Sequence, residues 1–297
     1  MPLLRLITGC MLVLGVAPAW AAYQLNMTPG VSEVSQQVYH LHMTIFWICV
    51  AIGAIVFSVM LYSIVRHRKS LGYKPATFHE NLTVEIIWTV IPFVILIAMA
   101  VPATRTLIFM DDTASADLTI KITGHQWKWQ YDYLDHDLGF YSNLSTPTDQ
   151  IANKAPKGEL YLLEVDNPLV VPVGKKIRFL ATANDVIHSW WVPALAVKKD
   201  TLPGFINETW TRIDHVGVYR GQCAELCGVN HAYMPIVVDA RSEADFLAWV
   251  HETKETQRKA IEEAKQAFTL PDLIKKGEAV YNRVCSACHQ QNGQGMA

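Results

Sequence analysis

Residues of four types that bind soft metals lie close together in the segment GQCAELCGVNHAYMP. Cys223, Cys227, His231 and Met234 follow the pattern C-x3-C-x3-H-x2-M, and His188 in DVIHSWW precedes Cys223 by 35 residues. Thiolates, imidazoles and a thioether together select copper more naturally than magnesium, calcium or manganese. The glycine and proline residues around the segment favour a metal-binding loop between strands over a continuous helix.

The cysteine count indicates what kind of site this loop could form. A blue-copper site needs one cysteine, two histidines and a weak axial methionine, whereas this loop offers two cysteines. Two bridging thiolates with one histidine each could hold two copper ions, with Met234 and a backbone carbonyl as weak ligands. A Cys2His2 zinc site would leave Met234 unused, and a disulfide between Cys223 and Cys227 would leave the histidines unused as well. The donor types therefore favour copper.

A second group, Cys285, Cys288 and His289, has the C-x-x-C-H pattern that attaches haem c through two thioether bonds and a proximal histidine. A thiol oxidoreductase is the alternative, but it gives His289 no role and needs a strand and helix around the motif that the sequence lacks. We expect residues 271–297 to begin a cytochrome c module. Because only eight residues follow His289, the module should be incomplete and poorly packed from about residue 268.

The elements that position these groups begin with an export signal. Arg5 precedes an apolar run over residues 6–16, and Pro18 with the small residues of APAWAA follows it. These are the three parts of a secretory signal peptide, so residues 1–22 are expected to be removed. Lipidation at Cys10 is the alternative, but the apolar stretch before Cys10 is too short for it.

Two uncharged runs, residues 43–65 and 86–104, are long enough to cross a bilayer at about 1.5 Å per residue. The connection between them carries Arg66, Arg68, Lys69 and Lys74, so the positive-inside rule places it in the cytoplasm and the rest of the chain outside. Buried core helices are the alternative, but they leave the basic connection unexplained. We expect a transmembrane hairpin, with helices at about 43–65 and 85–104, within residues 23–110.

After residue 111 the apolar pattern changes to that of short strands. LTIKIT, KKIRFLATA and ETWTRI alternate apolar and polar residues, PIVVD forms a further short run, and turns rich in Gly, Pro, Asn and Asp separate them. This spacing predicts a sandwich or barrel over residues 111–240. Residues 241–270 predict a charged helix, whose Phe246, Trp249 and Val250 pack on the barrel, followed by a linker. The fold class is therefore a membrane-anchored α+β protein.

Composition agrees with this organisation. The chain of 297 residues is 51% hydrophobic and only 18% charged, which excludes a disordered protein. Its formal net charge of −2 provides no basic field, so no nucleic-acid partner is expected.

The motifs HSWWVPAL, KKDTLPG and GQCAELCGVNHAYMPI, after two apolar helices, resemble subunit II of cytochrome c oxidase over about residues 30–250. The resemblance implies a cupredoxin-like Greek-key barrel with a binuclear copper centre, CuA, which takes electrons from cytochrome c and passes them to haem in subunit I for reduction of oxygen to water. It implies these copper ligands: the side chains of His188, Cys223, Cys227, His231 and Met234, and the carbonyl oxygen of Glu225. It also implies a magnesium ion, shared with subunit I, at the Glu225 carboxylate.

Two further residues gain roles from the resemblance. Trp127 in GHQWKWQYDY matches the tryptophan through which electrons reach copper. The spacing of Trp127, Trp129, Tyr131 and Tyr133 also fits one face of an alternating strand, which does not exclude that role. Glu85 in NLTVEIIWTVIP matches a carboxylate at the mouth of a proton pathway. An acidic residue at a helix N-terminus is also a favourable partner of the helix dipole, which is the alternative for Glu85.

The resemblance predicts an electron-receiving subunit of a proton-pumping terminal oxidase in a bacterial inner membrane, with the CuA domain on the periplasmic side. Its expected partners are subunit I, the other oxidase subunits, cytochrome c and membrane lipid, and a fused cytochrome c extension occurs in some members. A membrane-tethered copper carrier is an alternative, but it needs an accessible, exchangeable site. A quinol-oxidase subunit that has lost its copper is another, and the complete ligand set argues against it.

Overall fold

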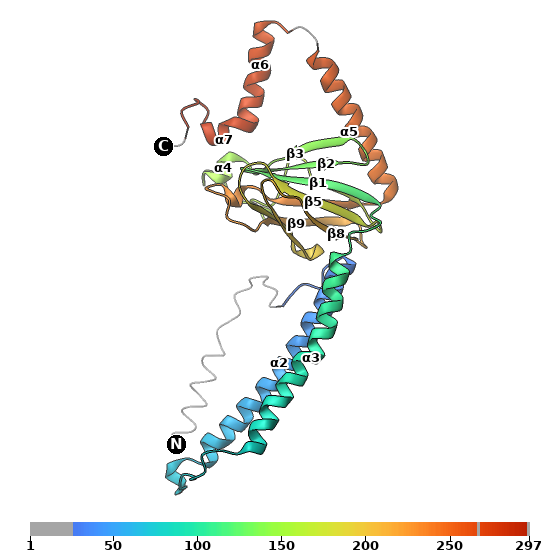
Figure 1. The fold of residues 1–297 in the computed structure, drawn as a ribbon. Coiled ribbons are helices and arrows are strands. Elements are labelled where there is room, and N and C mark those ends of the chain that lie inside the picture. Colours follow the sequence, from blue (N-terminus) through green and yellow to red (C-terminus); the bar gives the residue numbers. More distant parts are fainter. Residues whose placement is uncertain (1–25, 266–267, 296–297) are drawn as a thin grey trace.

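The computed structural model describes residues 26–265 and 268–295, apart from the side chains of residues 287 and 288. A helical hairpin, a two-sheet β domain and a C-terminal helical segment follow one another along the chain (Figure 1). The predicted signal peptide, residues 1–22, and the alternative lipidation site Cys10 lie outside the described residues.

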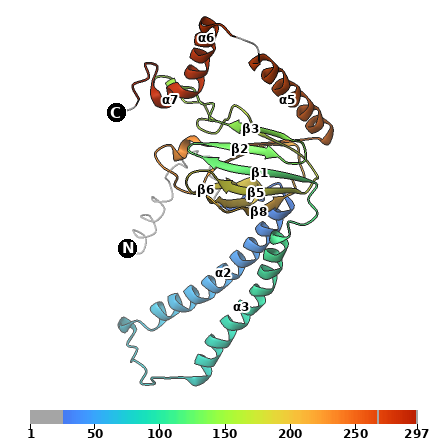
Figure 2. The ribbon, with the colours of Figure 1, turned by 45° about the horizontal axis from the view of Figure 1, so that its top comes forward.

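The hairpin consists of α2 (Glu33–Arg66) and α3 (Leu82–Asp111), with the short 3-10 turn η1 (Lys69–Leu71) between them. Both helices contain the predicted spans but are longer, and their additional turns lie mostly at the end next to the β domain (Figure 2). Both are long and apolar enough to cross a membrane, and no residue in the most apolar window of either is buried. That exposure argues against buried core helices. The basic connection lies at the far end of the hairpin from the β domain (Figure 1), as its charge predicts.

Ten strands form two five-stranded sheets that pack face to face (Figure 1). The first has the order β3 (Leu138–Ser142), β2 (Lys128–Tyr133), β1 (Leu118–His125), β5 (Ile177–Ala183), β8 (Asn207–Thr211). The second has the order β4 (Leu169–Pro172), β10 (Ile236–Arg241), β9 (Gly217–Cys223), β6 (His188–Val192), β7 (Val197–Thr201). Short helical turns lie in the connections: α4 (Thr148–Ile151), η2 (Pro193–Leu195), η3 (His231–Tyr233).

The sequence pattern explains this sheet packing. The core between the sheets is filled from both sides. The first sheet contributes the fully buried side chains of Ile120 and Ile122 in β1, Trp129 in β2 and Phe179 in β5, and the second contributes Val238 in β10. Thr119 and Lys121 of β1 and Arg178 of β5, which alternate with these core residues, are partly exposed, so these strands turn one face to the core. The parallel pairs β1 with β5 and β4 with β10 connect strands distant in sequence, giving a cupredoxin-like domain, and the predicted strands at LTIKIT, KKIRFLATA, ETWTRI and PIVVD are confirmed.

The C-terminal part is helical. Helix α5 (Glu243–Ala264) begins at Ser242, whose hydroxyl oxygen accepts a hydrogen bond from the amide of Asp245. Its Phe246 and Val250 are buried, and Trp249 packs on Tyr133 of β2, as the apolar pattern predicts. After it come α6 (Leu270–Val280), the π-helical turn η4 (Tyr281–Cys285) and α7 (Ser286–His289). No residue of α6 is buried, and the assignment of this segment to a cytochrome c module stays a prediction.

Candidate metal centre

The predicted metal-binding residues meet at one end of the β domain because two paired strands and one loop bring them there. His188 opens β6 and Cys223 closes β9, and these strands are antiparallel neighbours with Trp190 opposite Cys223. The chain then forms a loop, in which Cys227 lies and His231 occupies η3, before it returns as β10 beside β9. The loop expected from its glycine and proline residues is therefore present.

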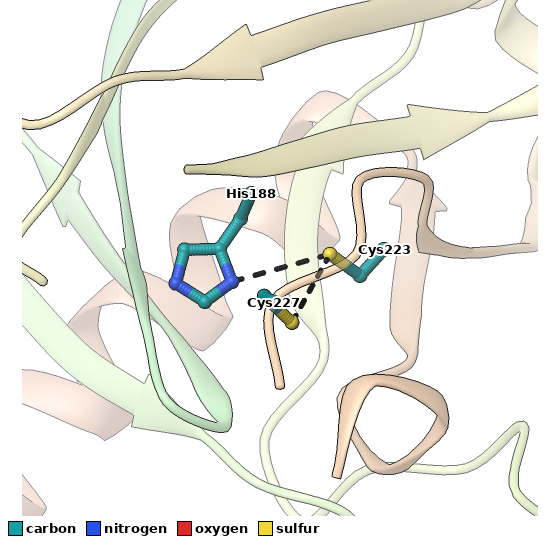
Figure 3. Close-up of side chains that lie close together, drawn as sticks. All are labelled: His188, Cys223 and Cys227. Atoms are coloured by element: carbon teal, nitrogen blue, oxygen red, sulfur yellow. Dashed lines mark hydrogen bonds between the residues drawn. The ribbon is translucent and has the colours of Figure 1, made fainter. Parts of the chain in front are cut away.

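The ligand atoms of His188, Cys223 and Cys227 all lie within 4.8 Å of one another, close enough to share a metal ion (Figure 3). The Cys223 Sγ is 4.0 Å from His188 Nδ1 and 3.9 Å from Cys227 Sγ. The Cys227 Sγ is 3.5 Å from both His231 Nδ1 and Met234 Sδ. His188, Met234 and both cysteines are buried, whereas His231 is half-buried.

The sulfur atoms form no disulfide, because a disulfide requires about 2.05 Å between them and both cysteines are free. A separation of 3.9 Å instead suits two thiolates that share a metal with bonds of about 2.3 Å. The carbonyl oxygen of Glu225 lies 3.3 Å from Cys223 Sγ and adds a hard donor. Two thiols, two imidazoles, a thioether and a carbonyl thus fit a soft transition metal.

The thiols have opposite pKa shifts in the metal-free chain. Burial raises the pKa of Cys223, but its hydrogen bonds with His188 and with the backbone at Ser189 outweigh burial and leave that pKa lowered. Burial and the nearby negative charge of Cys223 raise the pKa of Cys227 to about 12. The pair therefore favours one thiolate and one thiol. A bound cation favours the deprotonated form of both.

His188 is held from several sides by residues that the sequence motifs did not single out. Its Nε2 lies 2.8 Å from the carboxylate of Asp185, which leaves Nδ1 to face the sulfur atoms. The Asp185 carboxylate also accepts a hydrogen bond from the amide of Gln126. Gly124 of β1 lies against the imidazole, since a Cβ there would be 2.7 Å from His188 Cδ2. In the sequence, Asp185 could have been found as a carboxylate three residues before the candidate ligand His188. No feature of the sequence marked Gly124 as a neighbour of that ligand.

The tip of the hairpin between β1 and β2 holds the metal-binding loop. Trp127 Nε1 donates to the carbonyl oxygen of Cys227 at 3.1 Å, and Gln126 Nε2 donates to the same oxygen at 2.8 Å. Trp129 Nε1 donates to the carbonyl oxygen of Met234 at 3.1 Å. Trp127 is half-buried in the turn before β2 rather than on its buried face, where Trp129 and Tyr131 lie. The alternating spacing therefore agrees with packing of all four aromatic side chains against one core, although Trp127 itself lies just before β2.

The other predicted site residues lie apart from this cluster. The Glu225 side chain is exposed in the loop. Glu85 is in the first turn of α3, at the far end of the hairpin, where its Oε1 accepts a hydrogen bond from the amide of Asn81. Cys285 is half-buried in η4 and His289 is exposed in α7.

A cupredoxin-like domain with a candidate metal centre, on a two-helix membrane anchor, defines the class of this protein, and comparisons with known proteins give its family. Residues 20–106 match the family described as cytochrome c oxidase subunit II, transmembrane domain, and residues 118–241 match its periplasmic domain. The chain belongs to the cytochrome c oxidase subunit II family and is thus a component of an oxidase complex.

Individual relatives have names that agree with this family assignment. A protein of Rickettsia prowazekii named "Probable cytochrome c oxidase subunit 2" is 44% identical, over 77% of this chain and 72% of that protein. "Cytochrome c oxidase subunit 2" of Cereibacter sphaeroides is 37% identical, over 76% of this chain and 79% of that protein. The crystal structure of the periplasmic domain of subunit II of Bradyrhizobium japonicum cytochrome oxidase is similar at 42% identity, covering 48% of this chain and 98% of that one with a TM-score of 0.44.

Proposed function

We propose that this chain is the subunit that receives electrons from cytochrome c at a binuclear copper centre, CuA, and passes them to haem in subunit I. One observation carries the proposal: two thiols, two imidazoles, a thioether and a backbone carbonyl converge at one closed end of the β domain. The proposed ligands are His188, Cys223, Glu225 through its carbonyl oxygen, Cys227, His231 and Met234.

The arrangement supports two metal ions over one. His188 lies nearest Cys223 and His231 lies nearest Cys227, so each thiol has its own imidazole. Cys223 and Cys227, each with its own imidazole, would supply three donors to each of two ions, and Met234 and the Glu225 carbonyl would add weak donors. A bound copper pair would supply one-electron chemistry in which the single added electron is spread over both ions, which suits reversible electron transfer.

The protein contributes rigidity and exclusion of water. His188 and Met234 are 0% and 2% exposed, and the Asp185 carboxylate fixes the imidazole of His188. Fixed ligands change position little when the charge of the site changes, so electron transfer requires little reorganisation. The same closure argues against a copper carrier, because a carrier must release its metal to a partner.

Trp127 is the proposed point at which electrons reach the centre. Its indole is half-buried at the hairpin tip, and its Nε1 donates to the carbonyl oxygen of Cys227. That hydrogen bond gives a short route from a partly exposed ring to a copper ligand. Gly228 keeps this route compact, because a Cβ there would lie 3.1 Å from the ring carbon Trp127 Cζ2.

The proposed orientation puts the CuA domain on the periplasmic side of a bacterial inner membrane and Glu85 at the cytoplasmic mouth of a proton pathway. The basic connection at the far end of the hairpin supports this orientation. The hydrogen bond from Asn81 to Glu85 equally supports a helix-capping role for that carboxylate.

Two further cofactors complete the proposal. Magnesium at the Glu225 carboxylate would need ligands from another subunit, because in the described part of the chain Glu225 belongs to no group of three or more His, Cys, Asp or Glu ligand atoms. Haem c at Cys285, Cys288 and His289 rests on the sequence motif alone.

Near-infrared absorption and metal analysis of the purified full chain test the copper proposal. We expect two copper ions per chain and a mixed-valence band, both lost in Cys223→Ser and in Cys227→Ser. Cys49→Ser is the matched control, because Cys49 is a free, exposed cysteine of α2 and should leave both signals unchanged. Zinc in place of copper, or two coppers retained in either loop variant, would contradict the proposal.

A further inference from the structure

Both membrane helices contact the same short stretch of the β domain, residues 210–214, and the start of α2 also bonds to the carbonyl oxygens of Ala194 and Leu195. At the start of α2, the amide of Glu33 donates to the carbonyl oxygen of Arg212, and the amide of Asp214 donates to the carbonyl oxygen of Val31. The Glu33 carboxylate also lies 3.2 Å from Arg212 Nη1. Ser32, which caps α2, is fully buried. The first turn of α2 is therefore part of the β domain's packing.

The end of α3 is attached two residues earlier on the same stretch. Trp210 of β8 is 3% exposed, and its Nε1 donates to the carbonyl oxygen of Phe109 at 3.2 Å. The Trp210 and Phe109 rings are 5.1 Å apart in an edge-to-face arrangement. A side chain of the barrel thus binds one of the last carbonyls of the helix, which lack full hydrogen bonding within α3.

Lys176 completes this contact with a buried positive charge. Its side chain is 11% exposed, and its Nζ lies 4.6 Å from the centre of the Trp210 ring and donates to the carbonyl oxygen of Ala114 at 2.8 Å. The last turn of α3 has no basic residue and ends at Asp111, followed by Asp112. Because a helix C-terminus disfavours negative charge, Lys176, 3.7 Å from the Asp112 carboxylate, supplies the compensating charge from the barrel.

The same sheet extends from this attachment to the metal centre. β8 pairs with β5, β5 pairs with β1, and Gly124 of β1 lies against the imidazole of His188. A movement of the helices relative to Trp210 would therefore change the position of the metal centre relative to the membrane.

We propose that Lys176 and Trp210 are positioning residues that fix the metal end of the barrel relative to the membrane helices, and hence relative to the oxidase subunit that accepts its electrons. The proposal rests on the electron-transfer function proposed above. It assigns these residues no contact with copper or with cytochrome c.

Hydrogen exchange of the purified full chain measures the attachment directly. Lys176→Met keeps most of the apolar stem and removes the charge, and we expect the amides of residues 110–118 to exchange about tenfold faster. Trp210→Phe removes the hydrogen bond to Phe109 and should act in the same direction, while Lys176→Arg should restore most of the protection. Lys175→Met is the matched control, because the Lys175 side chain pairs with Glu243 of α5 instead.

Electron transfer in the assembled oxidase measures the consequence. In Lys176→Met, copper content, the near-infrared band and reduction by cytochrome c should stay normal, whereas onward transfer from copper to haem should slow several-fold. Normal onward transfer despite faster hydrogen exchange would overturn the positioning role, as would unchanged exchange in both variants. If the wild-type chain binds no copper pair, the function proposed above fails, and the exchange data still decide whether the attachment is rigid.

Discussion

Gly124→Ala should disturb the metal centre although residue 124 is not a ligand. An added Cβ would lie 2.7 Å from His188 Cδ2 and 3.0 Å from both His188 Cγ and Thr201 Oγ1. Carbon atoms pack best at about 3.5–4.0 Å, so the imidazole would have to retreat by about 1 Å. His188 is fully buried, and Asp185 holds its Nε2 at 2.8 Å, so that retreat is resisted.

Overpacking of this kind costs about 1–3 kcal/mol. If the added methyl group destabilises only the position of the His188 ring that binds metal, the whole cost appears in copper affinity. Since about 1.4 kcal/mol corresponds to a factor of ten, that affinity should fall about 5- to 140-fold. Competition with a copper chelator measures this affinity on the full chain. The control is Gly158→Ala, because a Cβ at Gly158 meets no atom within 4 Å. Equal affinities and identical near-infrared bands in the two variants would refute the packing argument.

Four further predictions address the remaining proposed roles. Trp127→Phe should leave copper content and spectrum intact but slow reduction by cytochrome c, so unchanged stopped-flow kinetics would exclude the proposed route. Glu85→Gln should lower steady-state oxygen consumption while rapid reduction of the copper centre stays normal; a normal turnover rate would leave Glu85 only its capping role. Because the pKa of Cys227 is about 12 without metal, copper binding should release a proton from its thiol. The apparent affinity for copper should therefore rise with pH, by up to about tenfold per pH unit for each proton released, and a pH-independent affinity would contradict this. Haem covalently bound at Cys285 should be detected by haem stain and mass spectrometry of the purified chain, and its absence would remove the haem proposal.

The sequence predicted those features whose cause is local. The transmembrane spans follow from uninterrupted apolar length, and the metal-binding loop follows from the spacing of Cys223, Cys227, His231 and Met234. Local pattern also predicted the strands, because alternation records which face of a strand is buried. The extra turns of α2 were missed because Glu33 and its neighbours are polar, and contacts with Arg212 stabilise that turn instead of lipid.

The support around the ligands depends on contacts between distant segments and could not be predicted in the same way. Trp127 has the spacing of a strand residue, but the chain turns at positions 126 and 127, and only the fold shows that its indole also bonds to the loop of Cys227 at the edge of the core. Gly124 is one glycine among 16, and only the strand arrangement brings it against His188. In the sequence, nothing distinguishes Lys176 from an exposed lysine. In the fold, Trp210 and the end of α3 enclose its side chain.

The candidate metal centre also closes the end of the β domain between its two sheets. Its proposed ligands belong to β6, β9 and the loop before β10, all of the second sheet, while the indoles of Trp127 and Trp129 bind that loop from the hairpin of the first sheet. Each indole donates to the backbone carbonyl of a cysteine or methionine ligand candidate, so the loop is held even before its side chains bind metal. Opening of this loop to release copper would break these contacts between the sheets. That requirement suits a permanent electron-transfer centre and opposes rapid exchange of copper with a partner protein.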